Sequence, residues 1–312
     1  ITYGDWSSDV CSSDLLGSGL IKGIGPTYQD KIGRQGLRVG DILSPEFPAR
    51  FRHLVEIHLD ILSDHPVEFD FPALEADFME AVAFLRQYQL IDSEYFINEE
   101  LKRGSRVLAE GAQGALLDID FGSYPFVTSS NTVTAGACNG LGVSPHRIGE
   151  VYGICKAYST RVGSGPFPTE LMDATGEKIR KQGHEFGSTT GRPRRCGWLD
   201  LPSLRYSIMI NGTTQLLLMK ADVLSDFETI KVCTHYRLQD GTETDKIPFE
   251  IANEPVTPVY KELPGWREAL RPGKWNDMPA ALREYVAFIE KELAVPVRLL
   301  SIGPDRLETI MR

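Results

Sequence analysis

The sequence predicts an α/β fold, because apolar segments of two kinds alternate along its 312 residues. Three segments carry apolar residues at the 3.6-residue spacing of an amphipathic helix, and five shorter apolar runs have the length of buried strands. Several of these runs end directly in loops rich in glycine, threonine, serine or charge. Ligands of open α/β sheets bind beyond the carboxyl ends of strands, so these loops are the predicted functional region.

The three predicted helices span residues 49–62, 72–90 and 278–293, and Pro72 suits the first turn of the second. The apolar faces are formed by Phe51, Leu54, Val55 and Ile61 in the first, Phe78, Ala81, Val82 and Leu85 in the second, and Leu282, Tyr285, Ile289 and Leu293 in the third. The predicted strands span residues 106–111, 151–162, 214–222, 228–238 and 295–303. We find no internal repeat and no low-complexity linker.

The composition excludes several classes of protein. No apolar run approaches the roughly 20 residues that cross a bilayer, and the first residues lack the features of an export signal. The five cysteines are scattered without C-x-x-C spacing, which indicates reduced thiols in a cytoplasmic protein. A net charge of −10 disfavours nucleic-acid binding, so any anionic ligand needs a local cluster of basic residues.

Residues 1–20 do not fit the rest of the chain. They lack an apolar period, and "SSDVCSSDL" resembles translated sequencing adaptor, with a disordered tail as the alternative. We therefore expect a foreign or disordered junction at residues 1–20, followed by a single domain at residues 21–312. The chain stays acidic without the three aspartates of this segment.

The segment "GSTTGRPRRCGWLD" (187–200) concentrates Arg192, Arg194 and Arg195 in one loop. Arginine forms bidentate pairs with carboxylate or phosphate, and Thr189, Thr190 and Gly191 add hydroxyls and a permissive backbone, so the loop could close over a small anion. The ordinary alternative is a solvated basic turn. A large aromatic, Trp198, disfavours that alternative, because it suggests that the end of the loop packs down.

Three other loops carry candidate ligand contacts. Gln113 can both donate and accept hydrogen bonds, and Thr128 opens a run of hydroxyl and amide side chains. Lys220 and Asp222 follow an apolar strand, where a carboxylate can accept both N–H groups of a guanine edge; Ser301 and Gly303 follow another strand. Each of these is an ordinary polar turn if taken alone. The six histidines show no metal-ligand spacing.

Together these segments resemble the adenylosuccinate synthetase family from about Lys22 to the C-terminus. The resemblance lies in seven motifs that occur in the family's order: "GIGPTYQDK", "GLRVGD", "EGAQGALLDIDFGSYPFVTSSNT", "KAYSTRVGSGPFPTEL", "GSTTGRPRRCGWLD", "MKADVL" and "SIGPDR". It implies a P-loop-NTPase-like synthetase fold with a large, mostly parallel central sheet flanked by helices. The implied activity is a purine-biosynthetic ligation: IMP, L-aspartate and GTP give adenylosuccinate, GDP and phosphate through a 6-phosphoryl-IMP intermediate, on the path to AMP, with Mg²⁺ as cofactor.

The resemblance also implies roles for individual residues. IMP contacts match Arg34, Gln113, Thr128, Val162 and Arg192; aspartate contacts match Thr189, Thr190, Gly191, Arg192 and Arg194; GTP contacts match Arg194, Lys220, Asp222, Ser301 and Gly303. Arg34 matches an arginine that reaches the IMP site of a neighbouring subunit, which implies a homodimer.

The chain departs from the family at its N-terminal side. Leu20 occupies the place of a phosphate-binding threonine, and we find no Gly-rich phosphate loop with catalytic aspartate and lysine, and no N-x-G-H-like stretch. We therefore expect an N-terminally truncated enzyme without catalytic or metal residues of its own, inactive and poorly folded as written. The alternative is a non-catalytic IMP- and guanine-nucleotide-binding protein. A Ras-like GTPase is disfavoured, because G-x-x-x-x-G-K-[ST] does not occur.

Overall fold

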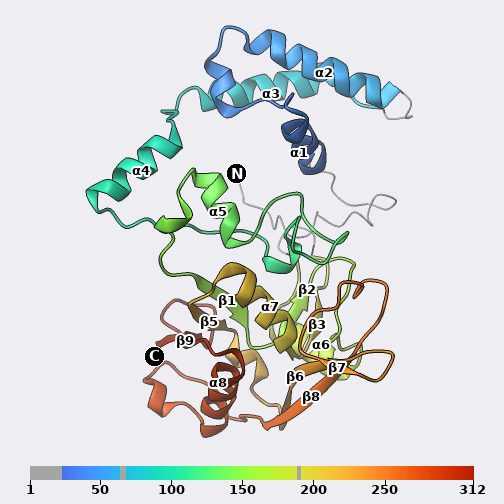
Figure 1. The fold of residues 1–312 in the computed structure, drawn as a ribbon, viewed down its shortest axis with the longest axis vertical. Helices are drawn as coiled ribbons and strands as arrows, with labels where there is room; N and C mark the ends of the chain where they lie inside the picture. The colour runs from blue at the N-terminus through green and yellow to red at the C-terminus, as the bar shows by residue number, and fades with distance from the viewer. Residues whose placement is uncertain (1–22, 64–67, 188–190) are drawn as a thin grey trace. The chain divides into compact units, whose positions relative to one another are not determined.

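The structure is a computed structural model that describes residues 23–63, 68–187 and 191–312 (Figure 1). The chain divides into two compact units. One is Ile21–Leu108, and the other contains Ala109–Arg312. Residues 1–20, for which we predicted a foreign or disordered junction, lie outside the described residues, as do Thr189 and Thr190 of the arginine loop.

The first unit is helical. Its elements are α1 (Ile24–Gly33), η3 (Val39–Leu43), α2 (Phe47–Ser63), α3 (Phe71–Leu85) and α4 (Ser93–Arg103). Helices α2 and α3 confirm the first two predicted helices. Asp70 caps α3 by accepting a hydrogen bond from the Ala73 amide at 3.1 Å, and Pro72 lies in its first turn as predicted.

The predicted apolar faces of α2 and α3 are only partly buried. Phe51 and Val82 lie in a small core with Ile42 and Phe47, whereas Ile61, Phe78, Ala81 and Leu85 are exposed and Leu54 and Val55 are half-buried. The predicted helices are therefore confirmed, while their apolar faces are covered only in part. Spacing indicates which residues share a helix face, but a two-helix core covers only part of that face.

The second unit is α/β, and the strands that the structure describes in it form three sheets. Strands β1 (Tyr152–Lys156), β5 (Gln215–Met219) and β9 (Val297–Ser301) are parallel neighbours, and β10 (Thr309–Met311) joins β9 antiparallel. A second sheet contains β4 (Leu199–Asp200), β6 (Thr229–Arg237), β7 (Glu243–Thr244) and β8 (Thr257–Pro264). Strands β2 (Ser159–Arg161) and β3 (Arg195–Gly197) pair antiparallel. The α/β class is confirmed, with two mixed sheets and one antiparallel pair among the described strands in place of one large sheet.

Among the described residues, this unit also contains four longer helices: α5 (Thr134–Leu141), α6 (Ala174–Gln182), α7 (Leu201–Asn211) and α8 (Ala280–Leu293). Helix α6 packs on β3, α7 on β6, and α8 on α7 and β8. The predicted face of α8 is fully confirmed, since Leu282, Tyr285, Ile289 and Leu293 are all buried in the main core. Short 3-10 helices are η4 (Ala115–Leu117), η5 (Pro145–Arg147), η6 (Ala221–Leu224) and η7 (Trp275–Asp277).

Three of the five predicted strands are confirmed as β5, β6 and β9. Residues 151–162 form two strands, β1 and β2, because the chain turns at Ala157 and Tyr158, both of which are buried. Residues 106–111 form no strand, and that prediction was wrong. A strand needs a partner ladder, no described residue pairs with this segment, and Leu108 is 85% exposed. Within the described ranges no helix is long and apolar enough to span a membrane.

Candidate active site

A cavity of about 430 Å³ opens in the α/β unit. Its walls come from residues 113–117, from β1 and β2, from residues 166–168 and from the start of α7. Three residues predicted from the sequence line it: Gln113, Val162 and Arg194. The structure therefore gathers segments that are far apart in the chain around one space.

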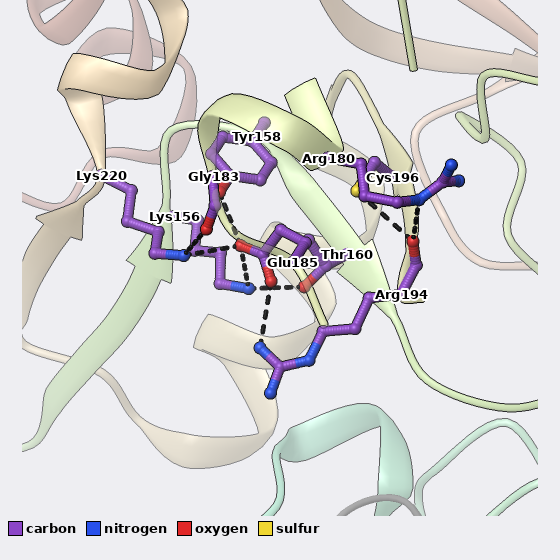
Figure 2. Close-up of polar contacts among 9 residues, drawn as sticks. All are labelled: Lys156, Tyr158, Thr160, Arg180, Gly183, Glu185, Arg194, Cys196 and Lys220. Atoms are coloured by element: carbon purple, nitrogen blue, oxygen red, sulfur yellow. Dashed lines mark hydrogen bonds and ion pairs between the residues drawn. The ribbon is translucent and has the colours of Figure 1, made fainter. Parts of the chain in front are cut away.

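A buried carboxylate, Glu185, organises the basic side chains at one wall (Figure 2). Its Oε1 atom accepts hydrogen bonds from the Tyr158 hydroxyl at 2.6 Å and from the Nζ atoms of Lys156 and Lys220, each at 2.9 Å. Its Oε2 atom accepts from Nη1 of Arg194 at 3.0 Å. Three cations thus share one anion, which we call the Glu185 cluster (Lys156, Tyr158, Glu185, Arg194 and Lys220).

The charges of the cluster shift its pKa values. Burial alone would raise the pKa of Glu185, but the charge of Lys156 and the hydrogen bonds from Tyr158, Lys156 and Lys220 outweigh it and lower the pKa to about 2. Burial also lowers the pKa of Lys156, an effect that Glu185 opposes. Because one carboxylate faces three cationic side chains, the cluster carries excess positive charge beside the cavity, which favours an anionic ligand.

The arginine loop is closed at its base by backbone pairing. The Arg194 amide donates to the Glu185 carbonyl at 2.9 Å, and Phe186 and Pro193 form an antiparallel bridge. Gly191 has φ +64°, a conformation that glycine adopts without strain. Arg192 follows at the exposed side of the loop. The hairpin places Arg194 inward at the cluster, two residues from Arg192.

The third arginine has a different role. Arg195 forms a two-point ion pair with Glu170 and donates to the carbonyls of Gly163 and Gly165 at 3.2 and 2.9 Å. Its guanidinium also lies 5.5 Å from the centre of the Phe167 ring. Arg195 therefore holds in place the segment that follows Val162, and this segment forms one wall of the cavity.

A second buried carboxylate, Asp118, shapes the loop that carries Gln113 and Thr128. Its Oδ1 atom accepts from the amides of Asp120 and Phe121 at 3.0 Å each, and its Oδ2 atom from the amides of Thr132 and Val133 at 2.6 and 3.3 Å. Thr128 is buried, and its amide donates to the Leu117 carbonyl at 2.8 Å. Gln113 has φ +62° and is exposed at the cavity.

The predicted guanine-recognition residues follow adjacent parallel strands. Lys220 and Asp222 follow β5, and Ser301 ends β9, so both groups lie at the same edge of the sheet. Asp222 has a buried Oδ1 atom without a hydrogen-bond partner among the described residues, and burial raises the pKa of this carboxyl. The Ser301 hydroxyl donates to the Gly303 carbonyl at 2.8 Å.

Arg34, a predicted IMP contact, belongs to the helical unit, where it caps the C-terminus of α1 with φ +64°. Within the described ranges, no three His, Cys, Asp or Glu side chains come together as a metal site. The described residues therefore offer no complete set of side-chain ligands for a Mg²⁺ ion.

Sequence reasoning missed three members of the cluster: Lys156, Tyr158 and Glu185. Lys156 ends β1 as Lys220 follows β5, so the rule that singled out Lys220 could also have found it. Glu185 had no comparable signal. A lone glutamate between a helix and a loop has many possible partners, and only the tertiary structure brings its four partners together.

Comparison with known proteins places the chain in a family. A family model for adenylosuccinate synthetase matches residues 12–310. The chain belongs to the adenylosuccinate synthetase family. It is 58% identical over 299 residues to the adenylosuccinate synthetase of Cytophaga hutchinsonii, which covers 95% of this chain and 69% of that protein. The enzyme of Parabacteroides distasonis is 56% identical over 309 residues, with 97% and 72% covered.

A solved structure of the family has the same fold. The fully ligated adenylosuccinate synthetase from Plasmodium falciparum superposes with a TM-score of 0.86 at 38% identity, over 93% of this chain and 69% of that one. The family that the seven motifs suggested is thereby confirmed, and the α/β fold with it. The chain spans about 70% of the length of these relatives.

Proposed function

We propose that this chain binds IMP, L-aspartate and GTP and serves the synthesis of adenylosuccinate, a GTP-dependent ligation. The observation that carries the proposal is the Glu185 cluster beside the cavity, because it supplies positive charge where two anionic substrates and a nucleotide must meet. Membership of the family gives the reaction. The proposed reaction is a step in the synthesis of AMP from IMP.

The roles of individual residues are part of the proposal. We assign IMP to Arg34, Gln113, Thr128, Val162 and Arg192, aspartate to Thr189, Thr190, Gly191, Arg192 and Arg194, and the guanine nucleotide to Arg194, Lys220, Asp222, Ser301 and Gly303. The position of Gln113, Val162 and Arg194 around one cavity supports this division. So does the buried, unpartnered Oδ1 atom of Asp222, which can accept the N–H groups of a guanine edge.

The steps of the proposed reaction explain why the site contains basic side chains. The keto oxygen of IMP is a poor leaving group, so its phosphorylation by GTP yields GDP and a 6-phosphoryl group that can depart as phosphate. The amine of aspartate then forms the new C–N bond as phosphate leaves. Guanidinium groups hold the two carboxylates of aspartate by charge-assisted hydrogen bonds, while the lysines offset phosphate charge. Mg²⁺ supplies further charge neutralisation in reactions of this kind.

Binding and turnover together test the proposal. Calorimetry of the 312-residue chain should detect IMP and GDP, and Arg194→Leu should weaken GDP binding by about tenfold or more through the loss of a charge-assisted contact. Phosphate release from GTP with IMP, aspartate and Mg²⁺ then decides catalysis. Turnover supports the ligation, whereas binding without turnover favours the non-catalytic alternative. Failure to bind either nucleotide contradicts the proposal.

The guanine assignment has a separate test. Asp222→Asn replaces one acceptor oxygen by a donor that would face the donors of guanine, so we expect GDP affinity to fall by about 10- to 100-fold. Binding of IMP, which does not use this carboxylate, should stay within about twofold. Equal loss of both affinities would show a general defect and would remove Asp222 from guanine recognition.

The remaining expectations stay predictions. These are a cytoplasmic location, the homodimer in which Arg34 reaches the neighbouring subunit, a single domain over residues 21–312, and a foreign or disordered junction at residues 1–20. Sedimentation of wild type and Arg34→Ala, with and without IMP, tests the homodimer. A monomer under all conditions would contradict it.

A further inference from the structure

Glu185 lies between two groups of proposed ligand contacts. On one side Arg194 and Lys156 line the cavity, and on the other Lys220 precedes Asp222 at the end of β5. The same carboxylate holds both sides, because Oε2 accepts from Arg194 and Oε1 accepts from Lys220 and Lys156 (Figure 2). One side chain thus bridges the two halves of the proposed site.

The backbone fixes this carboxylate in place. The Glu185 amide donates to the Arg180 carbonyl at 2.9 Å, at the end of α6, and the Glu185 carbonyl accepts from the Arg194 amide at 2.9 Å. The residue is fully buried. A displacement of Arg194 therefore weakens the hydrogen bond that Oε2 accepts from it and leaves more of the carboxylate's charge to the two lysines.

The lysine side depends on the same carboxylate. Lys220 has φ +61°, which is unusual for a residue other than glycine, so its backbone is held by its surroundings. Its Nζ atom donates to the Gly183 carbonyl at 2.6 Å and to Glu185 at 2.9 Å. These two bonds tie the Lys220 side chain to Gly183 and Glu185, and Lys220 is the residue that directly precedes η6, which contains Asp222.

We propose that Glu185 is a positioning residue that couples the cavity side of the site, Arg194 and Lys156, to the guanine side, Lys220 and Asp222. A ligand that draws Arg194 toward the cavity changes the hydrogen bond between Glu185 and Lys220. Ligand binding on each side therefore alters the affinity of the other side for its ligand. This coupling is reciprocal by thermodynamic necessity. The inference rests on the proposed function for its ligands, but not for the cluster itself.

Calorimetry with GDP, in the presence and absence of IMP and L-aspartate, tests the coupling in the whole chain. Aspartate is the cavity-side ligand that we assign to Arg194, so in wild type saturating IMP and aspartate together should change the affinity for GDP by about fivefold or more. Glu185→Gln has nearly the same shape without the charge, and we expect it to abolish this dependence and to weaken GDP binding by about tenfold. A merely structural role would weaken binding and leave the dependence on IMP and aspartate intact, which would overturn the proposal. Wild type with a GDP affinity that IMP and aspartate do not change would overturn it as well.

Two further variants serve as a matched control and as a substitute for Glu185→Gln. Glu292→Gln is the matched control, because Glu292 is a partly buried carboxylate paired with Arg205 at 2.7 Å outside the cluster; it should retain the coupling. Glu185→Asp serves if Glu185→Gln fails to fold. It keeps the charge but cannot reach Arg194 and Lys220 together, so the coupling should again be lost. Full coupling in a folded Glu185→Asp would contradict the inference.

A chemical modification experiment without nucleotides distinguishes failure of the inference from failure of the proposed function. Without the carboxylate, Lys156 faces the charges of Lys220 and Arg194 uncompensated, so its amine loses its proton more readily. Acetic anhydride at pH 8 should then modify Lys156 at least threefold faster in Glu185→Gln than in wild type, with exposed Lys181 as the internal reference. If wild type binds no nucleotide, the proposed function fails, and faster modification still supports the positioning role. Equal rates overturn it.

Discussion

At the scale of single residues, the site depends on close approach around Glu185. Gly183 ends α6 with an ordinary backbone conformation, so it is not required for its torsion angles. It is required for space, since a Cβ atom there would lie 2.4 Å from the Tyr158 hydroxyl oxygen and 3.1 Å from Cγ of Glu185. Glycine at this position lets Tyr158 reach the carboxylate.

Gly183→Ala should therefore destabilise the fold by about 1–3 kcal/mol, because the Tyr158 hydroxyl must move and lose its 2.6 Å hydrogen bond. Urea unfolding measures this change. The double variant with Tyr158→Phe is the control: it lacks the clashing oxygen, so its loss should be smaller than the sum of the two single losses. Strictly additive losses would show that Tyr158 does not make Gly183 necessary.

Residue types and spacing predicted part of this site. Arg194 follows from the clustering of arginines in one loop, Lys220 and Asp222 follow from the rule that polar residues at the carboxyl ends of strands face ligands, and Lys156 obeys the same rule. Glu185 could not be predicted, because its importance comes from four partners in segments that are far apart in sequence. The different role of Arg195 also depends on tertiary structure, since its partner Glu170 is 25 positions away.

At the scale of elements, prediction succeeded where one face is fully covered. Helix α8 and strands β5, β6 and β9 lie in the main core and were found from their apolar pattern. Helix α7 was missed although it has a clear start signal: Asp200 caps it by accepting from the Ser203 amide, and Pro202 lies in its first turn. Strand β8 was missed because it is largely exposed and begins and ends near prolines.

The loop of residues 113–133 contains little regular structure and depends on Asp118. Asp118→Asn would place an amide donor against two of the four backbone N–H groups that this carboxylate accepts. We expect a loss of about 1–3 kcal/mol in the free energy of unfolding and weaker IMP binding, because Thr128 and Gln113 lie on this loop. Urea unfolding and calorimetry with IMP measure the two effects.

Asp120→Asn is the matched control for this loop. Asp120 is exposed and its carboxylate contacts the Asn131 side chain at 2.6 Å, so its neutral form should change stability by no more than about 0.5 kcal/mol. If Asp118→Asn proved as mild as the control, Asp118 would not organise the loop.

At the scale of the whole molecule, the buried carboxylates make stability depend on pH. Glu185 has a folded-state pKa of about 2, against an ordinary value of 4.5. Below about pH 5 the unfolded chain takes up a proton at this residue and the folded chain does not, so its contribution is full above that pH and is lost as the pH falls toward 2. The contribution at neutral pH is about 3 kcal/mol.

The stability difference between wild type and Glu185→Gln should therefore change in favour of the variant as the pH falls from 6 to 3, as measured by urea midpoints. Asp222 provides a control of opposite sign. Burial raises its pKa, so its contribution is present at low pH and is lost as the pH rises through the raised value. The stability of wild type relative to Asp222→Asn should then increase as the pH falls. The same trend in both variants would mean that general acid unfolding, and not the ionisation of these two carboxylates, controls the pH dependence.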